Sequence, residues 1–324
     1  MIMARWSEDG LELSVVDCLL SMLICLILFI PASSALIVDA SEEWNDSILV
    51  EGGRSILVEE ISATWCDSCA EIDPYLMEVA DAHGSRIAMV TYHPSDGFDA
   101  FQPPASQHRI DRLEVTHPGV GSTPTFIVDG GLQRIGSQSW PDVQKDILTE
   151  EVNNRNPSKM SFVISKNNND SVTATTQSFS DLGNGKNVSQ LTFMLVKHSQ
   201  LVPDGFDNPG GKERDRVVYG IAECDLQNNT ITNSIGMLES KVDNNSCENG
   251  FSVTFDGVEQ FSILLIHEKS SSNLSPEDPS STFGVVEFAF RNLEINESWD
   301  NLLIVLIGFT LIGFLWKYYQ KSNK

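Results

Sequence analysis

A Cys-x-x-Cys pair between a strand and a helix is the feature that most constrains the fold of this chain. It lies in Trp65-Cys66-Asp67-Ser68-Cys69. The apolar run at residues 55–62 predicts a strand, and apolar residues spaced by three and four over residues 66–83 predict a helix. Backbone N–H groups at a helix start favour a thiolate, and the second cysteine lies one turn further in. We therefore expect Cys66 to be the nucleophile and Cys69 the resolving thiol.

The residues around this pair resemble the active-site region of thioredoxin-fold proteins. The resemblance rests on the run from Val58 to Cys69, on Pro74 five residues later, and on Thr123-Pro124-Thr125, which is similar to the family's cis-proline loop. It covers roughly residues 50–153. It implies a thioredoxin-like fold in which Trp65, Thr123 and Pro124 bind an extended substrate chain. It also implies a buried acid five residues before the tryptophan, Glu60, that relays the proton of Cys69.

Two neighbouring features bear on this chemistry. Alternation along a strand allows only one of Glu59 and Glu60 to face inward, and the resemblance selects Glu60; the alternative is that this side chain faces solvent. The intervening pair, Asp67-Ser68, supplies no imidazolium for the Cys66 thiolate, and Asp67 destabilises it. A destabilised thiolate favours the disulfide, so a reductase or isomerase is expected rather than a strong oxidase. A reductase would need an electron donor, which the sequence does not identify.

Beyond residue 157 the composition changes to short alternating runs separated by Asn, Gly, Asp and Ser turns, which is typical of an antiparallel β-sandwich. The expected fold class is thus an α/β thioredoxin-like domain at residues 36–157, an all-β sandwich (Ig-like) domain at 158–291 and a C-terminal transmembrane helix. This layout, with residues 57–66 and 90–94, is similar to outer-membrane-protein-related thioredoxin-like proteins. Cys224 and Cys247 are expected to form a structural disulfide within the sandwich.

Apolar segments at both ends predict a membrane location. Residues 1–35 resemble a signal peptide or an uncleaved N-terminal anchor. The run at residues 302–319, which is uncharged as far as residue 316, is long enough to span a bilayer. Residues 292–301 then form a juxtamembrane linker, and residues 320–324 a cytoplasmic tail. The prediction is a cell-membrane protein with a large extracytoplasmic part, single-pass if the N-terminal segment is cleaved and two-pass if it is not.

Net charge and motif content restrict the function classes. A formal charge of −24 repels nucleic acid, so no nucleic-acid partner is expected, and no cofactor motif is present. The expected activity is thiol–disulfide exchange with extracytoplasmic protein thiols or disulfides. The main alternative is a surface binding or scaffold protein whose Cys66–Cys69 bond stays closed. A weaker alternative is copper handling, for which His93 is the candidate ligand beside Cys66 and Cys69.

Overall fold

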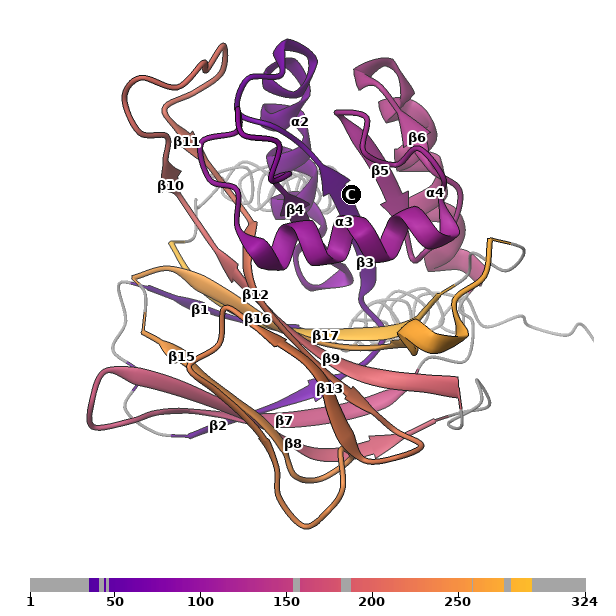
Figure 1. Cartoon of the computed structure of the whole chain (residues 1–324), viewed down its shortest axis with the longest axis vertical. Coiled ribbons are helices and arrows are strands. Elements are labelled where there is room, and N and C mark those ends of the chain that lie inside the picture. Colours follow the sequence, from indigo (N-terminus) through magenta and orange to yellow (C-terminus); the bar gives the residue numbers. More distant parts are fainter. Residues whose placement is uncertain are drawn as a thin grey trace, which may run out of the picture.

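The computed structural model describes residues 35–40, 44, 47–153, 158–181, 188–257, 259–276 and 281–292. Strands dominate this part of the chain, which contains only three α-helices. The helices gather at one end of the molecule, above two packed sheets (Figure 1). They are α2 (Asp67–His83), α3 (Pro104–Thr116) and α4 (Trp140–Asn153).

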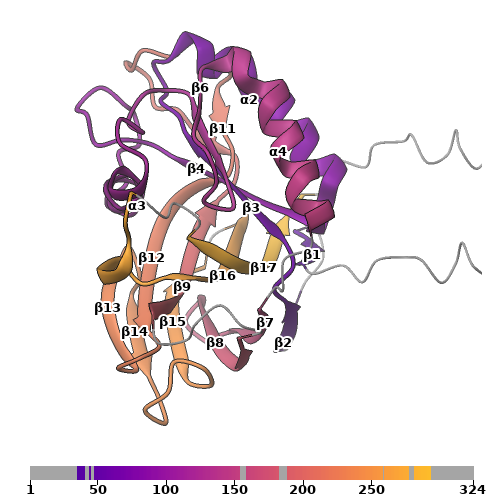
Figure 2. The same ribbon diagram turned by 90° about the vertical axis from the view of Figure 1, so that its right-hand side faces the viewer.

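Four short strands, paired partly in parallel and partly antiparallel, lie between the helices. In Figure 2, α2 and α4 cover one face of these strands and α3 covers the opposite face. The central strand β3 is parallel to β4 and antiparallel to β5, which in turn pairs with β6. The four strands are β3 (Ile56–Ile61), β4 (Ile87–Tyr92), β5 (Thr125–Val128) and β6 (Arg134–Ile135).

These strands are one end of a ten-stranded sheet with the order β1-β17-β16-β9-β12-β4-β3-β5-β6, to which β13 adds beside β12. A second sheet of five strands, β14-β15-β8-β7-β2, packs against its far half. The small β10–β11 hairpin rises beside α2 (Figure 1). The remaining bounds are β1 (Ala35–Asp39), β2 (Ile48–Gly52), β7 (Lys159–Lys166), β8 (Ser171–Ser180), β9 (Ser189–Lys197), β10 (Gln200–Leu201), β11 (Glu213–Arg214), β12 (Val217–Asp225), β13 (Thr230–Ile235), β14 (Glu239–Val242), β15 (Phe251–Asp256), β16 (Phe261–Lys269) and β17 (Thr282–Arg291).

The predicted fold class, an α/β domain followed by a sandwich and a membrane helix, is therefore wrong. Strands from both predicted regions form one sheet, joined where β12 runs parallel to β4 and the Thr91 N–H donates to the Arg216 carbonyl at 2.9 Å. The N-terminal strands were expected within the thioredoxin-like domain. They pair instead with strands from beyond residue 157, β1 with β17 and β2 with β7. The domain boundary at residue 157 stays a prediction.

The packing explains why the two regions merge. Helix α3 buries Ile110 and Leu113 in one apolar cluster that contains Leu57 of β3 together with Val218 of β12 and Leu264 of β16. Apolar surface removed from water contributes about 25 cal/mol per Å², so a core shared in this way disfavours separating the regions. A second cluster fills the space between α2, α4 and the other face of β3, and a third fills the space between the two sheets.

Helix α3 itself was underestimated from the sequence. Three prolines fall within residues 94–107, and proline runs favour irregular structure. The helix instead begins at Pro104. Proline is well tolerated in the first turn of a helix, where its missing N–H has no intrahelical partner to lose.

The membrane prediction is not supported. No helix within the described ranges is long and apolar enough to cross a bilayer. The segments on which the prediction depended, residues 1–34 and 302–319, lie outside those ranges, as do the proposed linker from residue 293 and the tail at 320–324. The single-pass and two-pass placements are withdrawn.

Candidate active site

The Cys66–Cys69 disulfide lies at the start of α2. Cys66 is the N-cap residue, and its Sγ accepts a hydrogen bond from the Cys69 N–H at 3.1 Å. The Ser68 hydroxyl lies 3.6 Å from the same sulfur. Cys66 is 4% exposed and Cys69 is fully buried. The arrangement places N–H and O–H donors where a Cys66 thiolate would form, while the Asp67 side chain is exposed and its repulsion is screened by solvent.

The tryptophan before the pair is fixed by a loop that follows β4. The Trp65 indole N–H donates to Asp96 at 2.8 Å, and 36% of the residue is exposed. In the same loop, buried Asp99 accepts the Thr64 N–H at 2.8 Å and lies 2.8 Å from His93 Nδ1. These hydrogen bonds, with the charge of His93, lower the pKa of Asp99 although burial opposes them. The loop therefore holds the backbone just before the disulfide in a fixed position.

The loop expected to hold a cis proline does so: the Thr123–Pro124 peptide bond is cis. It directly precedes β5, which pairs with β3. The substrate-binding roles of Trp65, Thr123 and Pro124 remain predictions.

Both glutamates of β3 are buried, so the expectation that only one faces inward was wrong. The reason is that β3 is an interior strand covered by helices on both faces (Figure 2). Glu59 contacts Arg109 and Tyr92 on the α3 side. Glu60 accepts a weak hydrogen bond from Thr91 at 3.4 Å. Burial raises the pKa of Glu60 well above its usual range, and the nearby Asp73 carboxylate raises it further.

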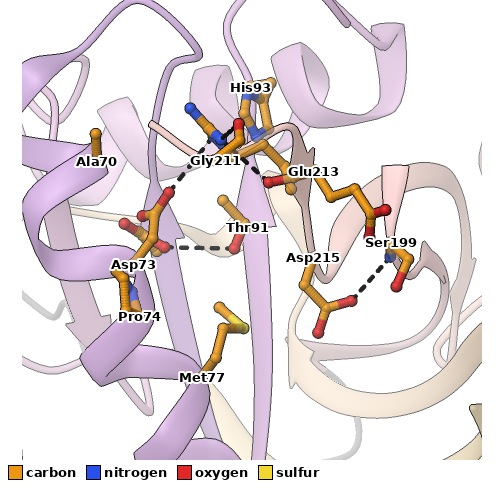
Figure 3. A pocket seen from close by; sticks show the side chains of 12 residues that line it. Ala70, Asp73, Pro74, Met77, Thr91, His93, Ser199, Gly211, Glu213 and Asp215 are labelled. Carbon is orange, nitrogen blue, oxygen red and sulfur yellow. Dashed lines mark hydrogen bonds and ion pairs between the residues drawn. The ribbon is translucent and has the colours of Figure 1, made fainter. Parts of the chain in front are cut away.

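A cavity of about 210 Å³ opens beside Glu60. Its walls come from α2, from β4 and from the chain around β11, which lies opposite α2 (Figure 3). Asp73 of α2 and His93, which follows β4, both line it. Burial raises the pKa of Asp73 to about 6, although Arg214 and His93 oppose the shift. The cavity thus combines two carboxyl groups whose pKa values are raised by burial with a buried imidazole.

The β10–β11 hairpin brings Arg214 to this site, a residue that no motif in the sequence indicates. Its Nε lies 3.5 Å from the Asp73 carboxylate, and its Nη2 donates to the Thr64 carbonyl at 3.4 Å. Residues 204–214 carry only the composition of a polar loop, and no local signal in the sequence links them to Cys66. Arg214 therefore links the hairpin to α2 and to the segment just before Cys66.

The copper candidate finds no support in the described part of the chain. No group of three or more His, Cys, Asp or Glu side chains there could hold a metal ion. The Nδ1 atom of His93 is occupied by Asp99.

The second disulfide joins Cys224 and Cys247, as expected from the sequence. Both residues are fully buried in the core between the two sheets, and the Thr176 hydroxyl donates to the Cys247 carbonyl at 2.9 Å. This bond has the setting of a structural crosslink rather than of a reactive pair.

No family model and no curated protein matches this chain. Among solved structures it is similar to HBP35 of Porphyromonas gingivalis, at 15% identity and a TM-score of 0.47, over 75% of this chain and 78% of that one. It is also similar to protein AGR_C_4864 from Agrobacterium tumefaciens, at 14% identity and a TM-score of 0.45, over 72% of this chain and 92% of that one. Likenesses of this strength identify neither a family nor a function.

Proposed function

We propose that this protein is a thiol–disulfide oxidoreductase of the reductase or isomerase type, with Cys66 as nucleophile and Cys69 as resolving thiol. The observation that carries the proposal is the position of Cys66 at the N-cap of α2, where its sulfur accepts the Cys69 N–H. A helix N-terminus and such donors lower the pKa of a cysteine thiol and so increase the fraction present as the reactive thiolate. The partners would be protein thiols or disulfides, and a reductase would need a separate electron donor.

A buried carboxyl group on the strand before the disulfide supports the same proposal. Thiol–disulfide exchange requires the resolving thiol to lose and regain a proton, and Glu60 is placed on the strand that leads into Cys66. Relationship to thioredoxin-fold proteins, suggested by the residues around Cys66, is a proposal as well. It is supported by the cis bond at Pro124 and by the position of Pro74 within α2.

A second candidate function is a binding or scaffold role in which the Cys66–Cys69 bond stays closed. It is favoured by the low exposure of both residues, 4% for Cys66 and 0% for Cys69. In that case the disulfide would only stabilise the start of α2.

Trapping distinguishes the two candidates. In the Cys69→Ser variant, a reactive Cys66 forms a mixed disulfide that cannot be resolved, and dithiothreitol then releases the captured protein. The matched control is Cys66→Ser, which keeps only the fully buried Cys69 and should capture nothing. Wild-type protein should also accelerate insulin reduction by dithiothreitol. If Cys69→Ser captures no more protein than the control and insulin reduction is not accelerated, the exchange proposal is wrong.

A further inference from the structure

Asp73 lies one helical turn after Cys69 in α2. The two residues are four apart in α2, and side chains at this spacing lie on the same helix face. Asp73 is only 19% exposed and lines the cavity beside Glu60. Its Oδ1 atom has no hydrogen-bond partner among the described residues. One carboxyl oxygen of Asp73 is therefore not committed to holding the fold together.

The cavity contains further buried polar atoms without a protein partner in the described residues. They are Glu60 Oε1 and His93 Nε2, and both residues are fully buried and line the cavity. Three such atoms around about 210 Å³ provide space and partners for several hydrogen-bonded water molecules. A proton could pass among these groups without crossing apolar core.

We propose that Asp73 is the group that exchanges a proton with the Cys69 sulfur, with Glu60 as a second proton store across the cavity. The proposal rests on the exchange function proposed above and deepens it. The transfer takes place between side chains four residues apart on one face of α2. Glu60, expected from the sequence to relay the proton alone, then acts together with Asp73.

When a substrate dithiol reduces the protein disulfide, electrons and protons balance in the following steps. A substrate thiolate attacks Cys66 Sγ, a substrate–Cys66 disulfide forms, and the Cys66–Cys69 bond breaks with its electron pair going to Cys69. The Cys69 thiolate takes the proton of Asp73. A second substrate thiolate then displaces Cys66, so the substrate dithiol is oxidised and the protein disulfide is reduced. In the reductase direction, the Cys66 thiolate first attacks a substrate disulfide and releases one substrate thiolate. Ionised Asp73 then removes the Cys69 proton, and Cys69 attacks Cys66 Sγ, forms the Cys66–Cys69 bond and releases the second substrate thiolate.

The surroundings of Asp73 determine the pH at which it can donate a proton to Cys69 or accept one from it. Burial disfavours an ionised Asp73, while Arg214 and His93 favour it. The carboxyl groups of Glu60, Glu213 and Asp215 also face this cavity. Asp215 is itself paired with His198 at 2.8 Å, which limits its influence. With the pKa of Asp73 at about 6, the base form predominates above that pH and the acid form below it.

The test follows one step, resolution of a Cys66–glutathione mixed disulfide prepared on the reduced full-length protein. Release of glutathione is measured in single turnovers from pH 4.5 to 9. In the wild type the rate should rise through an apparent pKa near 6. Asp73→Asn should slow release at pH 7 on the order of 10²-fold, the lower end of what a positioned general base contributes. Its remaining pH dependence should then follow ionisation of the Cys69 thiol alone, without an inflection in the acid range.

Two further variants test whether the effect of Asp73→Asn comes from the Asp73 carboxyl group itself. Glu71→Gln removes the same charge from an exposed position of α2 two residues away and should behave like the wild type. Asp73→Glu should restore the inflection in the acid range. An Asp73→Asn profile that superimposes on the wild type would overturn the proposal. Because the assay uses glutathione, that result is independent of whether a protein substrate is captured by Cys69→Ser.

Discussion

Replacing Arg109 with methionine should destabilise the whole protein severely, because this arginine joins α3 to both halves of the large sheet. Its guanidinium is fully buried and lies 2.7 Å from Glu59 of β3 and 2.6 Å from Glu268 of β16. Methionine fills a similar length of space but leaves both carboxylates without this cation. Removing one partner of a buried ion pair costs about 3–5 kcal/mol.

In Arg109→Met, Glu59 and Glu268 would keep different numbers of hydrogen-bond and ion-pair partners. Glu268 keeps Arg112 at 3.4 Å and the Thr192 hydroxyl at 2.6 Å, whereas Glu59 keeps only the Tyr92 hydroxyl among its described contacts. Most of the cost should therefore come from Glu59. We expect Arg109→Met to lower the free energy of unfolding by about 4 kcal/mol, a large part of the 5–15 kcal/mol typical of a domain.

Urea unfolding followed by tryptophan fluorescence measures this loss. Arg86→Met is the matched control, since Arg86 is half exposed and its ion pair with Glu151 is long, at 3.5 Å. It should change stability by less than about 1 kcal/mol. Adding Glu59→Gln to Arg109→Met should recover part of the loss by removing the unpaired charge. A loss below about 1 kcal/mol for Arg109→Met would refute the assignment of this cluster as a link between the two halves.

Two other predictions concern the core between the sheets. Burial lowers the pKa of His267 to about 4, so its contribution to stability is complete above the unfolded value near 6.5 and is lost as pH falls toward 4. Unfolding free energies measured over this range should fall by about 3 kcal/mol more in the wild type than in His267→Gln; equal slopes would contradict the assignment. Replacing Cys224 and Cys247 with serine opens a crosslink between residues 23 apart and should cost about 3 kcal/mol in urea unfolding. A cost near zero would indicate that the crosslink is not structural.

Local structure could be predicted well from this sequence where residues close together decide it. The alternating runs correspond to strands such as β13, and the apolar spacing after Cys66 corresponds to α2. Partner strands could not be predicted, because apolar runs look alike whether they pair with a neighbour or with a strand more than a hundred residues away. The contact between β4 and β12, which makes one sheet of two expected regions, leaves no local trace.

The residues of the candidate site that lie close together in the sequence could be predicted, and those that lie far apart could not. Cys66, Cys69 and Glu60 lie within ten residues of one another, so a local motif could identify them. The contribution of Arg214 could not be predicted, because it depends on where a distant hairpin lies relative to α2. The sequence alone does not distinguish Asp73 from other acidic residues of α2 such as Glu71. The structure does, because Asp73 lines the cavity and Glu71 is exposed.

The central claim, that the Cys66–Cys69 pair exchanges with other thiols, is tested most directly by its reduction potential. Equilibrating the full-length protein with glutathione or dithiothreitol buffers, and counting the free thiols of Cys66 and Cys69 by mass spectrometry after alkylation, gives this value. Exchange proteins fall at about −270 to −120 mV, whereas structural disulfides lie below about −300 mV. We predict a value in the lower part of the exchange range, since no imidazolium lies between the cysteines to stabilise the reduced form. A value below about −300 mV would contradict the proposed function and favour a permanently closed bond.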